Sequence, residues 1–189
     1  MHFKFPIVLA SGSPRRKQLL EELGLTFEVL VRPVSELFPD DLHPRAVAVL
    51  IAENKAKAYL DLPGNKVVIT ADTLVVVDNE ILGKPADEAE AVAMLKKLSA
   101  KTHQVITGVT ISHEGKFKSF VEETQVTFRN LQDEEIRHYV ARYKPYDKAG
   151  GYAIQEWIGQ IGITRIEGDY YNVVGLPVSR LYQELGMLD

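Results

Sequence analysis

The most apolar stretch of the chain lies at residues 67–78, where β-branched residues dominate. This pattern predicts a central strand that is buried on both faces. Asp72, near the middle of the stretch, interrupts it. Its carboxylate needs a cation, a metal ion or strong hydrogen-bond donors, because burying even a neutral polar group without a partner costs roughly 2–7 kcal/mol. The alternative is that Asp72 caps a bulge or turn inside a hairpin.

The remaining hydrophobic patterns predict a series of strands and helices along the chain. Strands are expected at residues 6–10, 27–31, 67–78, 81–85, 103–111, 117–128 and 161–166, and residues 168–177 are expected to form a loop or a strand between glycines. Helices are expected at residues 14–24, 44–60, 87–98, 133–143 and 177–185, with Pro14 in the first turn of the first helix and Asp87 as the cap of the third.

Composition narrows the class of protein. A length of 189 residues fits one domain or two small lobes. The net charge of -4 argues against a dedicated nucleic-acid binder, which normally carries a basic surplus. The absence of cysteine excludes disulfides and thiolate metal sites and agrees with a reducing cytoplasm. We also expect no signal peptide and no membrane span, because the apolar run near the N-terminus is short.

The first predicted helix begins with an unusual group of charges. Arg15, Arg16 and Lys17 occupy its first turn, where the helix dipole disfavours cations, and two serines, Ser11 and Ser13, precede them. Together with the backbone N–H groups of the helix start, these side chains predict an anion site suited to phosphate. The alternative interpretation is a solvated basic face.

The chain lacks several standard catalytic motifs, among them a Walker phosphate loop, a His-Glu-x-x-His pair and a Gly-x-Ser-x-Gly elbow. It does combine basic residues near strand ends with a few acids, chiefly Asp72 and Glu36. Carboxylates suit Mg²⁺ or Mn²⁺, and basic side chains neutralise phosphate oxygens. These residues therefore indicate an enzyme acting on a phosphate ester or anhydride.

Six ordered runs carry a resemblance to a known family. They are residues 11–16 (SGSPRR), 53–56 (ENKA), 71–73 (ADT), 83–85 (GKP), 147–155 (DKAGGYAIQ) and 168–177 (GDYYNVVGLP). In this order they resemble the Maf family over nearly the whole chain. The resemblance implies a single α/β domain over residues 1–189: a two-lobed mixed β-sheet flanked by helices with a central cleft, like the inosine triphosphate pyrophosphatase (Maf/Ham) fold. It also implies hydrolysis of a nucleoside triphosphate to the monophosphate and pyrophosphate with a divalent cation, Mg²⁺ or Mn²⁺.

The resemblance also implies a substrate and roles for individual residues. Arg15, Thr73 and Gln155 are similar to the residues of the branch that prefers dTTP and UTP. Asp72 would be the general base, acting directly or through the metal, or a metal ligand only, and Glu36 would assist with the metal. The residues expected to hold the phosphates are Ser13, Arg16, Lys55, Lys84 and Lys148. An amide at position 155 suits the imide edge of thymine or uracil, although a buried structural amide is the alternative.

A second class of function stays open at this stage. The chain could be a nucleotide-binding regulator of cell division without turnover, but the presence of Asp72 among intact basic positions argues against it. An RNA-binding module fits poorly with the acidic balance. We expect a nucleoside triphosphate as substrate, no nucleic-acid or membrane partner, a cytoplasmic location, and a homodimer as one option through an apolar hairpin face.

Overall fold

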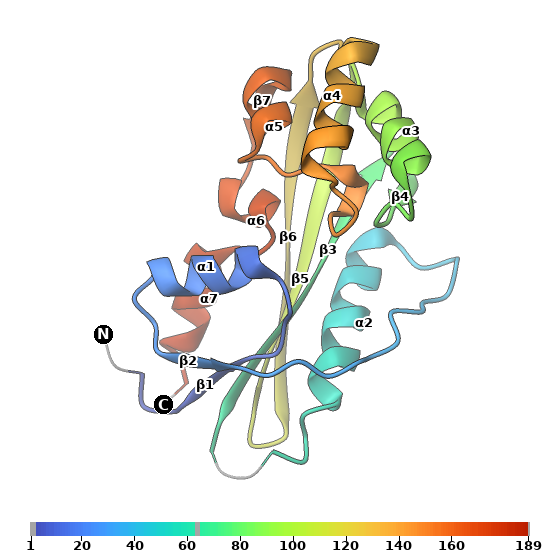
Figure 1. Cartoon of the computed structure of the whole chain (residues 1–189). Helices are drawn as coiled ribbons and strands as arrows, with labels where there is room; N and C mark the ends of the chain where they lie inside the picture. The colour runs from blue at the N-terminus through green and yellow to red at the C-terminus, as the bar shows by residue number, and fades with distance from the viewer. Residues whose placement is uncertain (1–2, 63–64, 189) are drawn as a thin grey trace. The chain divides into compact units, whose positions relative to one another are not determined.

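The computed structural model describes residues 3–62 and 65–188 (Figure 1). Its strands are β1 (Ile7–Leu9), β2 (Phe27–Val29), β3 (Val67–Val77), β4 (Glu80–Leu82), β5 (Thr102–His113), β6 (Lys116–Phe128) and β7 (Ile163–Glu167). Its helices are α1 (Pro14–Glu22), α2 (Pro44–Lys57), α3 (Glu88–Leu98), α4 (Asp133–Tyr143), α5 (Trp157–Gly162), α6 (Tyr170–Val174) and α7 (Val178–Leu185), with the 3-10 helix η1 (Ala149–Gly151).

The strands form a mixed sheet in the order β2-β1-β3-β5-β6-β7, with β4 paired to β3. β1 pairs in parallel with both β2 and β3, while β3–β4 and β6–β7 are antiparallel. This arrangement confirms the predicted mixed sheet flanked by helices. None of the helices in the described part of the chain is long and apolar enough to cross a membrane.

The chain divides into two compact units. Unit 1 comprises Met1–Asp72, Thr107–Glu122 and Gly175–Asp189, and unit 2 comprises Thr73–Ile106 and Glu123–Val174. The three long strands β3, β5 and β6 each contribute residues to both units. The expectations of a single domain and of a central cleft stay predictions.

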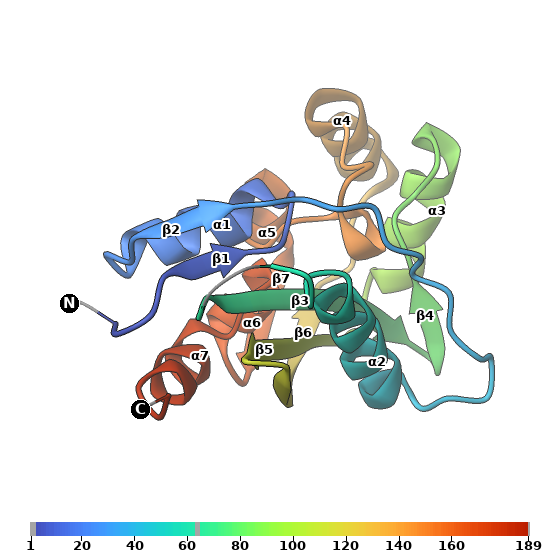
Figure 2. The same cartoon turned by 90° about the horizontal axis from the view of Figure 1, so that it is seen from below.

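In unit 1, helix α2 packs closely on the strands. Gly108 of β5 allows this approach, since a Cβ at that position would lie 2.3 Å from the carbonyl oxygen of Ala48 in α2. The Thr70 hydroxyl of β3 donates to the carbonyl of Ala52, also in α2, over 2.7 Å. Figure 2 shows α2 and α7 on opposite sides of β3 and β5. These contacts fix α2, which carries Lys55, against β3. The first stretch of unit 1 ends within β3, at Asp72.

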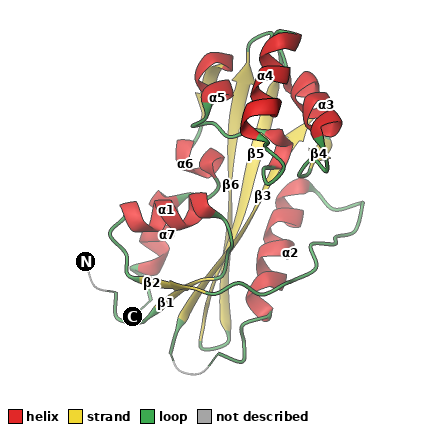
Figure 3. Ribbon diagram, viewed as in Figure 1, coloured by secondary structure: helices red, strands yellow, loops and turns green. Residues whose placement is uncertain are grey.

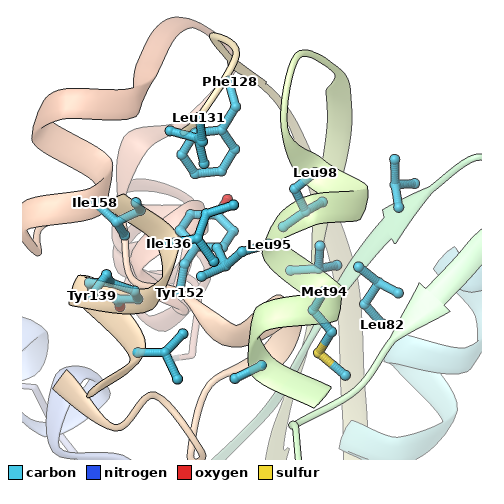
Figure 4. Packing of buried hydrophobic residues seen from close by; sticks show 14 of the residues in the cluster. Leu82, Met94, Leu95, Leu98, Phe128, Leu131, Ile136, Tyr139, Tyr152 and Ile158 are labelled. Carbon is cyan, nitrogen blue, oxygen red and sulfur yellow. The ribbon is translucent and has the colours of Figure 1, made fainter. Parts of the chain in front are cut away.

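Unit 2 has its own hydrophobic core between helices and strands. Helices α3, α4 and α5 contribute buried side chains that pack against those of β6 and of the segment before α5, as Figure 4 shows. The labelled members of this core are Leu82, Met94, Leu95, Leu98, Phe128, Leu131, Ile136, Tyr139, Tyr152 and Ile158. The buried side chains of α3 and α4 therefore lie on the helix faces that pack in unit 2.

The helix ends follow the predicted capping pattern. The Ser13 hydroxyl caps α1, with Pro14 as the first helical residue, and the Asp87 carboxylate accepts a hydrogen bond from the N–H of Glu90 over 2.9 Å. Gly24 follows α1 with φ +71°, a conformation that glycine adopts without strain. Helix α2 ends at Lys57, slightly before the predicted limit.

Two segments near the C-terminus differ from the sequence prediction. Residues 161–166 were expected to form a strand, but Ile161 and Gly162 close helix α5 and the strand β7 begins only at Ile163. Residues 168–177 were expected to form a loop or strand, yet they contain helix α6 (Figure 3). Long-range packing accounts for both differences, because it overrides weak local propensity in short segments.

Candidate active site

Asp72 lies in β3, at the end of the first stretch of unit 1, and it is 9% exposed. Its carboxylate oxygen Oδ1 lies 2.8 Å from the Nζ of Lys55, and the same Nζ lies 2.8 Å from Oε1 of Glu36. The Lys55 ammonium therefore bridges two carboxylates. This ion pair meets the requirement that a buried carboxylate has a partner. The alternative of a cap inside a turn is wrong, since Asp72 lies within a continuous strand.

Arg16 joins the turn before α1 to β3. Its Nη1 donates to the carbonyl oxygen of Ala71 over 2.9 Å and to the hydroxyl of Ser11 over 3.2 Å, while its Nε donates to the carbonyl of Gly175 over 2.8 Å. Burial lowers the pKa of Arg16, and the nearby carboxylate of Asp72 opposes that shift. The guanidinium still stays charged. The structure thus places the basic turn beside the acid.

The start of α1 has the charge distribution predicted from the sequence. No acid lies in the first turn of this helix, all of which the structure describes. Ser13 accepts a hydrogen bond from the N–H of Arg16 at 3.5 Å, and its own N–H donates to the Ser11 hydroxyl over 3.2 Å. The charge of Arg15 is close enough to lower the pKa of Arg16 further. Two like charges beside an N-terminal cap make the start of α1 electropositive.

A divalent metal would find two oxygen ligands in unit 1, Asp72 and Glu36. No group of three or more acidic, histidine or cysteine side chains suited to a metal occurs in residues 3–62 and 65–188. Two carboxylates that already share one cation nevertheless fit Mg²⁺, which is usually bound by one or two carboxylates and takes its other ligands from water and substrate phosphates.

The other predicted site residues belong to unit 2. Thr73 directly follows Asp72 in β3, and Lys84 is exposed after β4. Lys148 is 8% exposed, and its Nζ lies 2.8 Å from Asp147. The N–H of Gly150 donates to the carbonyl of Gly83 over 2.9 Å. This bond joins the segment of Lys148 to that of Lys84.

The Gly-Gly pair has an unusual backbone. Gly150 and Gly151 have φ values of +68° and +71°. A Cβ on Gly150 would lie 2.9 Å from a methyl group of Val75. Both the dihedral angles and this contact require glycine at position 150.

Gln155 is exposed and lies in a turn, so the alternative of a buried structural amide is wrong. The sequence analysis did not identify the neighbouring Glu156, whose carboxylate lies 3.4 Å from the Nζ of Lys148. Its position next to Gln155 was the only signal in the sequence. The structure thus brings together two sets of predicted residues: Asp72, Lys55, Glu36 and Arg16 in unit 1, and the segments of Lys84, Lys148 and Gln155 in unit 2.

Comparison with known proteins completes this description. Residues 6–188 match the family model described as Maf-like protein. A dTTP/UTP pyrophosphatase of Porphyromonas gingivalis is 52% identical over 186 residues, which cover 96% of this chain and 94% of the relative. A dTTP/UTP pyrophosphatase of Phocaeicola vulgatus is 52% identical over 187 residues, which cover 98% and 97%.

Among solved structures, the Staphylococcus aureus Ham1 protein matches with a TM-score of 0.51 and 21% identity, covering 95% of this chain and 99% of that chain. This likeness supports the predicted Maf/Ham fold. The family match over almost all of the described residues, together with the relatives at about half identity, shows that the chain belongs to the Maf family.

Proposed function

We infer that the chain is a nucleoside triphosphate pyrophosphatase that hydrolyses dTTP and UTP to the monophosphate and pyrophosphate. Relatives at 52% identity over nearly the full length are dTTP/UTP pyrophosphatases. The structural observation that carries the inference is the buried carboxylate of Asp72, which is paired with Lys55 beside the basic turn of α1. The combination of an acid and several cations suits a reaction at a polyphosphate.

In the proposed reaction, Asp72 takes a proton from the attacking water as that water's oxygen bonds to the α-phosphorus. The bond between the α-phosphorus and the bridging oxygen to the β-phosphorus breaks, and its electron pair leaves with pyrophosphate. Lys55 lies 2.8 Å from the Asp72 carboxylate and holds it in place. A positioned general base of this kind typically contributes 10²- to 10⁴-fold to the rate.

Basic side chains would balance the charge of the triphosphate and of the departing pyrophosphate. We assign this role to Arg16, Lys55, Lys84 and Lys148, together with the Ser13 hydroxyl. Arg16 also binds the backbone carbonyls of Ala71 and Gly175, so it orders the segments around the acid. Loss of one donor to developing charge typically costs about 3 kcal/mol of transition-state stabilisation.

Asp72 and Glu36 are the residues that we expect to hold Mg²⁺ or Mn²⁺. When bound, such an ion neutralises phosphate oxygens and increases the acidity of a water molecule. The shared contact with Lys55 supports the assignment, since both carboxylates face the same cation. A metal titration of the Asp72→Asn variant tests the role of Asp72 as a metal ligand.

We assign selection of the nucleobase to Arg15, Thr73 and Gln155. The exposed amide of Gln155 can donate to a carbonyl and accept from the imide N–H of thymine or uracil. This pairing favours thymine and uracil over cytosine and adenine, whose ring nitrogen at that edge carries no hydrogen. The assignment rests on the match of these residues to the dTTP/UTP branch of the family.

The test is pyrophosphate release from a panel of nucleoside triphosphates with Mg²⁺ or Mn²⁺. We expect dTTP and UTP to be preferred and Asp72→Asn to lose at least 10²-fold in kcat. Asp78→Asn is the matched control, because Asp78 directly follows β3 and its side chain is 68% exposed. Near-normal turnover by Asp72→Asn would refute the role assigned to Asp72.

The rival function, a nucleotide-binding regulator without turnover, predicts binding of dTTP with no pyrophosphate release at any metal concentration. Other expectations also stay predictions: the homodimer, the lack of nucleic-acid binding and the cytoplasmic location. Sedimentation of the purified chain addresses the first of these directly.

A further inference from the structure

The turn that carries Gln155 is fixed to the core of unit 2 by a buried hydroxyl. Ile154 and Gln155 form the centre of this turn, and the N–H of Glu156 closes it by donating to the carbonyl of Ala153 over 3.1 Å. Such a bond between the first and fourth residues is typical of a β-turn. Ala153 and Ile154 of the turn are buried, while Gln155 is exposed.

Tyr139 binds the turn from inside the core. Its hydroxyl accepts a hydrogen bond from the N–H of Ala153 over 3.2 Å and donates to the carboxylate of Glu156. The hydroxyl therefore binds both the first and the last residue of the turn. Tyr139 lies in α4, is fully buried and packs with Ile136 and Ile158 (Figure 4).

Glu156 extends this contact to the phosphate-binding lysine. One carboxylate oxygen accepts from Tyr139, while the other lies 3.4 Å from the Nζ of Lys148. Lys148 is 8% exposed, so its ammonium has little freedom to move. One chain of contacts, from Tyr139 through Glu156 to Lys148, thus joins the buried core, the turn of Gln155 and a cation.

We propose that Tyr139 and Glu156 are positioning residues that hold Gln155 and Lys148 in a fixed mutual arrangement, so that selection of the pyrimidine is coupled to binding of the phosphates. The proposal rests on the proposed function, because Gln155 and Lys148 take their roles from it. Its physical basis is geometric. An amide distinguishes bases only if its donor and acceptor are held in a defined orientation, and the contacts of the turn with Tyr139 and Glu156 supply that orientation.

The main test is Tyr139→Phe, which removes the hydroxyl and leaves the ring in the core. We expect the ratio of kcat/KM for dTTP to that for dATP to fall about tenfold, as expected when a hydrogen bond to a charged group is lost. The kcat for dTTP should change less than its KM, since Asp72 belongs to unit 1 and is untouched. Tyr143→Phe is the matched control, because the Tyr143 ring stacks on that of Tyr139 on the same helix.

A second measurement does not depend on activity. In Tyr139→Phe, the amide of Ala153 should exchange its hydrogen at least tenfold faster than in the wild type, because it loses its acceptor. Glu156→Ala keeps that acceptor but removes the contact with Lys148, so we expect it to raise the KM for dTTP and to lower the selectivity. This variant serves as the functional test if Tyr139→Phe does not fold.

Three outcomes would overturn the proposal. They are wild-type selectivity in both variants, unchanged exchange at Ala153 in Tyr139→Phe, and an equal loss of selectivity in Tyr143→Phe. Failure of the proposed function would look different: the wild-type chain itself would show no preference for dTTP, while the exchange at Ala153 would still respond to Tyr139→Phe.

Discussion

Removal of the Lys55 ammonium should destabilise the protein. Lys55→Met keeps the length of the side chain but leaves the carboxylates of Asp72 and Glu36 without their shared cation. Breaking a buried ion pair by removing one partner costs about 3–5 kcal/mol. The side chains of Lys55 and Asp72 are 17% and 12% exposed, whereas that of Glu36 is 46% exposed. Because solvent reaches part of the site, we expect the lower end, about 3 kcal/mol near neutral pH.

The destabilisation follows from the charges, since two carboxylates lose the cation that they share. The assay is urea unfolding of Lys55→Met and the wild type near neutral pH. Lys57→Met is the control, because Lys57 is exposed on the same helix.

The reasoning is refuted if the free energies of unfolding of Lys55→Met and Lys57→Met differ by less than about 1 kcal/mol near neutral pH. A difference that small is typical of solvent-exposed ion pairs. Added Mg²⁺ should stabilise Lys55→Met more than the wild type, since a bound ion would take over the role of the ammonium.

Three further predictions concern stability. Burial lowers the pKa of His103 to about 4 from its usual 6.5, so the unfolded chain binds a proton more readily; urea unfolding should show about 3 kcal/mol lost as the pH falls from 6.5 to 4, and His103→Phe should lack this loss. Gly108→Ala would place a methyl group 2.3 Å from the carbonyl oxygen of Ala48, so we expect destabilisation of about 3 kcal/mol by the same assay, and an unchanged midpoint would contradict the packing of α2. Asp87→Ala removes the cap of α3 and should lower the free energy of unfolding by about 1 kcal/mol, with Asp87→Asn as the control that keeps the cap.

The sequence was most informative where one residue broke a strong pattern. Asp72 in an apolar strand had to have a partner, and the structure supplies Lys55. The hydrophobic pattern alone could not identify that partner, because a lysine on a helix usually has a solvated ammonium. The metal-binding role of Glu36 came from the family resemblance. The distance from Glu36 to Lys55 depends on how α2 packs, which no local pattern encodes.

The segments after residue 156 were harder to predict for a related reason. Gly159 and Gly162 lower helix propensity, yet α5 forms because both glycines allow close contact: a Cβ on Gly162 would lie 2.8 Å from Leu131. In α6, the side chain of Asn172 donates to the carbonyl of Val105 and to the Thr124 hydroxyl, both far away in the sequence. Glu156 was overlooked because its partner Tyr139 lies 17 residues earlier, at a position that reads as plain core.

Because β3, β5 and β6 are divided between the two units, neither unit can be expressed alone from one simple truncation of the gene. The chain passes from one unit to the other at 72/73, 106/107, 122/123 and 174/175, so unit 1 is assembled from three stretches and unit 2 from two. A continuous gene fragment that encodes the whole of unit 1 is nearly as long as the full gene. A continuous fragment that encodes unit 2 also encodes residues 107–122, which belong to unit 1. A truncation library would therefore yield no autonomous half, and a shortened chain carrying unit 2 alone would need an artificial linker in place of those residues.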